Sequence, residues 1–215
     1  MMKAYEIDLK LSRSNPLIWR KIVVPAGITF KRLHDTIQMA MGWWDYHLYE
    51  FRIEEVGLRF TIDEEQYAEH KYMKALYANK KLTKEEDPYG FIERSIRGRV
   101  QKAQSSKIDS HLEKHNRLDY IYDFGDGWEH SIELIKIIDD YPFGYPIIID
   151  GVGDCPPEDV GGIPGYEDFL KIWNDPQHPD YEHMRSWGES QNFEPYDQAE
   201  LNRLLKEFIQ LKKVK

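Results

Sequence analysis

The chain has 215 residues, of which 41% are hydrophobic and 31% charged, and it has a net charge of −9. This length suits one sizeable core, the 13% aromatic content excludes a disordered chain, and the single cysteine excludes an internal disulfide framework. The apolar runs are too short to span a bilayer and the N-terminus lacks the apolar core of a signal peptide, so we expect a cytoplasmic protein with no membrane partner.

Charge is distributed unevenly along the chain. Residues 118–182 carry sixteen acidic and two basic side chains, which favours cations or basic surfaces as partners and disfavours phosphate backbones. Residues 1–34 carry seven basic and two acidic side chains. A nucleic acid would bind at this end, with Trp19 available for stacking and with the candidate contacts Lys10, Arg13, Arg20, Lys21, Lys31 and Arg32. Ordinary solvation of surface charges explains these residues about as well.

The first sixty residues predict the order strand, strand, helix, strand, strand. Strict alternation predicts a strand over 4–11 and a second over 18–24. Thr29 can cap a helix over 29–41 that Gly42 ends. Two further strands are expected over 47–53 and 58–62, and this order is compatible with a β-grasp-like half.

Residues 63–117 are rich in Glu, Lys, Gln and Ser, which indicates a poorly ordered insertion with one helix over 64–78 and a second helical piece before 118. Beyond it we expect a hairpin of strands 118–124 and 128–138, a strand over 145–150, a helix from Pro164, and an amphipathic helix over 197–211. The sequence thus predicts a single α+β domain over 1–215 with a mixed or mostly antiparallel sheet. Its expected core residues are Tyr5, Ile7, Leu9, Ile18, Ile22, Leu33, Ile37, Tyr49, Phe51, Leu134 and Phe169.

The predicted hairpin contains the candidate site residues Asp123, Asp126, Trp128 and His130. A two-residue turn at Asp126-Gly127 would place Asp123 directly opposite His130. A three-residue loop would instead oppose Asp123 to Glu129, a like-charge pair that costs stability. We therefore expect the Asp123 carboxylate beside the His130 imidazole. The pair is then either a tuned metal ligand or general base, or a structural pair that closes the hairpin.

The following loop offers the candidate residues Asp154, Cys155, Glu158 and Asp159. If strand 145–150 returns antiparallel beside strand 128–138, it brings this loop to His130 in one cleft. A divalent metal site of His130, Cys155, Glu158 and Asp159 would result, or a nucleophilic Cys–His–Asp set with Asp123. The simpler interpretation makes Cys155 a small buried hydrophobe and the carboxylates helix caps.

His34 and His47 are further candidates, because the predicted helix and strand point both toward the core. A lone histidine there is more often a satisfied core side chain than a ligand. His47 joins the candidate cluster only if the fold brings it to His130 and the cysteine loop.

Four motifs occur in a fixed order, at 16–20, at 47–51, at 122–130, and at 155–159 with Gly161-Gly162 and Gly165-Tyr166 behind it. In this order they resemble the open-reading-frame-three-like family named after an Ri plasmid. The resemblance covers most of the chain outside 63–117 and the last helix, and it implies an association with plasmids and other mobile elements. It implies no activity, since none is established for that family.

Two functions from different classes fit these observations. A non-enzymatic binding or adaptor protein, with a protein or nucleic-acid partner, fits the charge polarity and the absence of any complete catalytic motif. A metal-dependent hydrolase or nuclease fits the histidine, the cysteine and the carboxylates of the two candidate segments.

Overall fold

The structure is a computed structural model, and it describes residues 1–211. The last four residues of the predicted 1–215 domain lie outside the described residues. The first half begins with β1 (Met2–Leu11), β2 (Trp19–Pro25), α1 (Phe30–Met41), β3 (Tyr49–Ile53), a 3₁₀ turn (Glu54–Val56) and β4 (Leu58–Thr61). The predicted opening order is therefore confirmed. As expected, Thr29 caps α1 by accepting from the Arg32 amide, and Gly42, at φ 82°, ends it.

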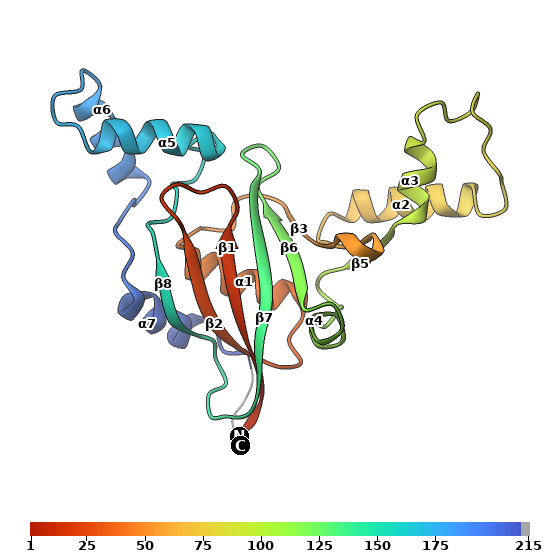
Figure 1. Cartoon of the computed structure of the whole chain (residues 1–215), viewed down its shortest axis with the longest axis horizontal. Helices are drawn as coiled ribbons and strands as arrows, with labels where there is room; N and C mark the ends of the chain where they lie inside the picture. The colour runs from red at the N-terminus through yellow and green to blue at the C-terminus, as the bar shows by residue number, and fades with distance from the viewer. Residues whose placement is uncertain (212–215) are drawn as a thin grey trace.

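The middle of the chain contains α2 (Glu64–Leu76), α3 (Phe91–Arg97), β5 (Arg99–Lys102) and α4 (Asp109–His115). In Figure 1, α2 and α3 project from one side of the sheet as an arm. The arm is shorter than the predicted insertion over 63–117, because β5 pairs with β4 in the sheet and the side chains of Ile108 and Leu112 are fully buried in the core.

The second half contains β6 (Arg117–Tyr122), β7 (Trp128–Tyr141), β8 (Ile147–Val152), α5 (Gly162–Trp173), α6 (Tyr181–Ser190) and α7 (Gln198–Phe208). The expectation that the 145–150 strand pairs with the 128–138 strand is wrong, because β8 pairs with β2. The physical reason is that β7 already has a partner on each side, β6 and β1.

All strands form one eight-stranded sheet in the order β5-β4-β3-β6-β7-β1-β2-β8 (Figure 1). Neighbours are antiparallel except for β4 and β5, which confirms the predicted α+β fold with a mixed, mostly antiparallel sheet. Among the described residues the opening strands do not form a β-grasp-like half, since β7, β6 and β3 separate β1 from β4. Within the described residues, no helix is long and apolar enough to cross a membrane.

The core lies between one face of the sheet and the helices that cover it. Along β1, Tyr5, Ile7 and Leu9 are buried on this face, whereas Glu6 and Lys10 point to the opposite face. Leu134 lies only half-buried at the margin of the core. The other predicted core residues are buried, namely Tyr5, Ile7, Leu9, Ile18, Ile22, Leu33, Ile37, Tyr49, Phe51 and Phe169.

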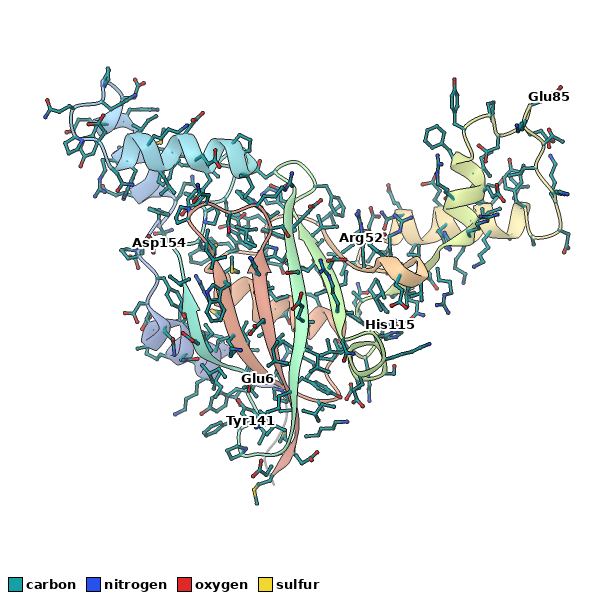
Figure 2. All side chains as sticks on the ribbon, viewed as in Figure 1. Glu6, Arg52, Glu85, His115, Tyr141 and Asp154 are labelled. Atoms are coloured by element: carbon teal, nitrogen blue, oxygen red, sulfur yellow. The ribbon has the colours of Figure 1, made fainter. Side chains whose placement is uncertain are left out.

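Strand directions bring three distant segments to one edge of the sheet. The antiparallel steps across the sheet make β6 and β8 run the same way, while β3 runs the opposite way. The residues that follow β6, the residues that follow β8 and the residues that precede β3 therefore emerge together. Asp154, which follows β8, lies at this edge near α5 in Figure 2.

Gly188 should be required for the packing of α6 on α5. A Cβ atom at this position would lie 2.5 Å from Cζ3 of Trp173 and 3.1 Å from the ring of Phe169. Although Ala normally stabilises a helix interior relative to Gly, we expect Gly188→Ala to lower the free energy of unfolding by about 1–3 kcal/mol through overpacking. Urea unfolding measures this loss. In a double-mutant cycle, Trp173→Leu should relieve part of it; additive losses, or a stabilised G188A protein, would contradict the clash.

Candidate functional site

Three segments meet at the sheet edge: the loop 42–48 before β3, the turn 123–127 after β6 and the loop 153–161 after β8. The Asp123 amide donates to the Leu48 carbonyl at 3.0 Å, which joins the first two segments. The Gly161 amide donates to Oδ2 of Asp126 at 3.0 Å, which joins the second to the third. The hairpin end and the cysteine loop therefore lie together, as the sequence suggested, although through other residues than those expected.

The predicted pairing of Asp123 with His130 is wrong. In the observed register His130 lies opposite Tyr120, and the pair Tyr122 and Trp128 closes the hairpin. The turn spans five residues because Asp123 adopts a left-handed backbone, at φ 53°, and its Oδ1 accepts from the Gly125 amide at 2.8 Å. Asp tolerates this conformation and makes such local bonds readily, so the turn begins earlier than the Asp-Gly dipeptide indicates.

The residue that meets the carboxylates is His47. Its Nε2 lies 3.3 Å from Oδ1 of Asp159, 3.8 Å from Oδ2 of Asp123 and 3.9 Å from Oε2 of Glu158. Ligand atoms of His47, Asp123 and Asp159 all lie within 4.8 Å of one another. One imidazole and two carboxylates therefore form a close group, and the Glu158 carboxylate approaches it from the side of His47.

Glu158 is the buried member of this group, with a relative exposure of 4%. Its Oε1 accepts from the Tyr122 hydroxyl at 2.9 Å and from the Trp44 amide at 3.0 Å. Its Oε2, which faces His47, is buried without a hydrogen-bond partner, and so is Nε2 of His47. Burial raises the pKa of the Glu158 carboxyl, against the opposing effect of its two donors and of His47.

The loop that carries His47 is held in place by hydrogen bonds between Asp45 and two residues of α1. His34 is fully buried, with Nδ1 2.8 Å from the Tyr120 hydroxyl and Nε2 2.7 Å from Asp45. The Asp45 amide in turn donates to Oε1 of Gln38 at 3.0 Å. His34, Asp35 and Asp45 also lie close enough to hold an ion, but both ring nitrogens of His34 already have partners, so we assign this group a structural role.

The remaining candidates have structural positions. His130 and Trp128 are buried in the core, and Oδ1 of Asp154 accepts from the Tyr196 amide at 2.7 Å. Burial raises the pKa of the Cys155 thiol, which disfavours a nucleophilic thiolate. In the described part of the chain, neither His130 nor Cys155 joins a group of three potential ligands. Of the predicted metal ligands, Asp159 lies in such a group, with His47 and Asp123, and Glu158 lies beside it, 3.9 Å from Nε2 of His47.

The predicted nucleic-acid contacts do not form one basic surface. Arg20 is 1% exposed and donates to the carbonyls of Ala40, Trp19, Val152 and Gly153, because it lies on the core side of β2. Lys10 and Lys21 lie on the face of the sheet opposite the core, whereas Lys31 and Arg32 lie on α1. Carboxylates pair with most of these cations, namely Arg13, Lys21, Lys31 and Arg32.

Residues 3–204 match the family described as plasmid pRiA4b ORF-3-like protein. The chain belongs to this family. It is 32% identical over 196 residues to "Uncharacterized protein y4hQ" of Sinorhizobium fredii, covering 91% of this chain and 84% of that protein. The crystal structure of a protein of unknown function, MM3350 of Methanosarcina mazei, aligns with a TM-score of 0.69 and 28% identity over 92% of this chain and 97% of the other.

The site lies within the family motifs that the sequence shows. His47 opens the second motif, Asp123 is in the third, and Glu158 and Asp159 end the fourth. Sequence reasoning missed Tyr122, whose hydroxyl holds Glu158, and the backbone of Trp44. Tyr122 is the neighbour of Asp123 in the third motif, so the sequence could have pointed to it. The Trp44 donor is a backbone amide, which leaves no signal in the sequence.

His130 should make the protein sensitive to mild acid. Burial lowers its pKa to about 4 from an ordinary 6.5, so the folded state binds this proton less readily than the unfolded state. Above pH 6.5, His130 is neutral in both states and the full stability is present. As the pH falls from 6.5 toward 4, the free energy of unfolding decreases by about 3 kcal/mol in total. Urea unfolding near neutrality and near pH 5 should show a smaller pH effect in His130→Phe than in wild type. An unchanged effect would contradict this role, and the exposed His183, changed to Gln, is the control.

Proposed function

We propose that the protein binds one divalent metal ion through His47, Asp123, Glu158 and Asp159. The observation that carries this proposal is the unpartnered Oε2 of the buried Glu158, which faces an equally unpartnered Nε2 of His47. Buried polar atoms are normally satisfied, and imidazole nitrogens and carboxylate oxygens are both common metal ligands.

The spacing of the ligand atoms supports the same proposal. Atoms bound about 2.1 Å from one ion lie about 3–4 Å from each other. The three carboxylate oxygens lie 3.3–3.9 Å from Nε2 of His47, which suits ligands around an ion better than direct hydrogen bonds. One imidazole with three carboxylates favours Mn²⁺, Fe²⁺ or Zn²⁺.

If the protein has this metal centre, a metal-dependent hydrolase is a better candidate function than a non-enzymatic adaptor. Asp159 is largely exposed, so one side of the site opens to solvent and to a substrate. A bound ion with an open position lowers the pKa of a coordinated water and polarises a carbonyl or phosphoryl oxygen. A polyanionic substrate is disfavoured, because the carboxylates of the site have no Lys or Arg partner among the described residues.

Metal binding is tested by titrating Mn²⁺ or Zn²⁺ into chelator-treated protein by calorimetry. We expect one ion per chain, and a loss of affinity of at least about tenfold in Glu158→Gln and in His47→Ala. Affinity should also fall as the pH is lowered through the raised pKa of Glu158, because the proton competes with the ion. Asp168→Asn, at an exposed carboxylate of α5, should bind like wild type. No uptake by wild type, or equal losses in all variants, would refute the site.

The contact between the turn and the cysteine loop should hold the ligands together. Gly162 has a φ of +68°, and a Cβ there would lie 2.6 Å from the Asp126 carbonyl oxygen. Gly162→Ala should separate Glu158 and Asp159 from the other two ligands and weaken metal binding about tenfold. Gly90→Ala is the matched control, since Gly90 has the same φ and meets only the end of the Arg94 side chain at 3.8 Å. If both variants keep wild-type affinity, the contact does not position the ligands.

A further inference from the structure

The arm carries a pocket of about 540 Å³ that the proposed function does not use. It lies between the C-terminal end of α2, the loop behind it and α3. In Figure 1 the arm and the α5–α6 pair are at opposite ends of the molecule, and Glu85 marks the outer tip of the arm in Figure 2. The volume is in the range of small-molecule sites.

The lining of this pocket is basic in a protein whose net charge is −9. Four cations line it, Lys74, Lys80, Lys81 and Arg97, against Glu93 as the one acidic lining residue. Two of the cations are neutralised, because Lys80 pairs with Glu86 at 2.7 Å and Arg97 with Glu93 at 2.5 Å.

Lys74 and Lys81 remain without a carboxylate within 4.0 Å among the described residues. Lys74 donates to a neutral acceptor, the Gly98 carbonyl, at 3.4 Å. The pocket therefore has an uncompensated charge of two, which matches the −1.5 to −2 charge of a phosphate monoester near neutral pH.

The pocket also has an apolar wall, formed by the half-buried side chains of Tyr77, Leu82 and Ile96. In the described part of the arm, from 64 to 98, only His70 is buried, so the two helices share little core of their own. A ligand that bridges α2 and α3 would add the apolar contact and the charge neutralisation that this junction lacks.

We propose that this pocket binds a small phosphate monoester with a planar apolar body, the chemistry of a nucleoside monophosphate. The phosphate would lie between Lys74 and Lys81, and the planar group would stack on Tyr77 beside Ile96. A long nucleic acid fits less well, because the segment 64–98 carries seven acidic and seven basic side chains and so has no net attraction for a polyanion.

Calorimetric titration with AMP at low ionic strength tests the proposal, with inorganic phosphate and adenosine as the partial ligands. We expect AMP to bind one per chain, more tightly than either partial ligand. In Lys74→Gln/Lys81→Gln its affinity should fall at least about tenfold. The matched control Lys71→Gln/Lys84→Gln removes two exposed lysines of the same segment that do not line the pocket, and it should bind like wild type.

Protease digestion gives a second readout, because bound AMP should slow cleavage within the arm in wild type and not in the K74Q/K81Q variant. The proposal is overturned if wild type binds no AMP at millimolar concentration, or if the control double variant loses as much affinity as the test variant. It is also overturned if a single-stranded oligonucleotide binds well in both double variants, since charge alone would then explain binding. Both double variants should keep their metal affinity, so this test is separate from that of the metal site.

Discussion

The hydroxyl group of Tyr122 is the contact on which the arrangement at the sheet edge depends. It accepts from the Tyr46 amide at 3.0 Å and donates to Oε1 of Glu158 at 2.9 Å. Tyr122 is fully buried at the end of β6, so a rigid strand supports both bonds. One hydroxyl thus sets the loop of His47 against the loop of Glu158, and it leaves the second oxygen of Glu158 free to face the imidazole.

In this arrangement, opposing effects act on the protonation of Glu158. Removing a carboxylate from water disfavours its charged form, and burial outweighs the two donors on Oε1, so the pKa is raised. A proton or a cation on Oε2 relieves the cost of burial. Because ligand atoms of His47, Asp123 and Asp159 lie within 4.8 Å of one another beside Glu158, a divalent ion would contact more of these groups than a proton on Glu158 would.

The sequence predicted most elements of the fold because their signals are local. Alternation along β1, the cap at Thr29 and the stop at Gly42 each depend on neighbouring residues alone. The pairing of β8 with β2 could not be predicted in this way, since strand partners are chosen by the whole sheet. The predicted hairpin register was wrong for a different reason. The Gly125 amide donates to the side chain of Asp123, and this local hydrogen bond lengthens the turn.

The candidate site was predicted in part, and its errors follow from that register. Glu158, Asp159 and Asp123 were correctly placed near one another, but His130 was chosen over His47, because an expected cross-strand neighbour outweighed a histidine from a distant loop. The three loops of the site meet because of the directions in which β3, β6 and β8 run, and the hydrophobic periodicity of the sequence does not show these directions.

Three of the acidic side chains of residues 118–182 gather at this edge without a Lys or Arg partner among the described residues. Some carboxylates elsewhere have cationic partners, as Asp35 has Lys31 and Arg32, and Glu113 has Lys3. In the described structure, Asp123, Glu158 and Asp159 share only the imidazole of His47. A structural ion-pair network would place Lys or Arg among these carboxylates, as at Asp35. The carboxylates of the proposed site have no such partner among the described residues, so a bound cation would supply the positive charge there.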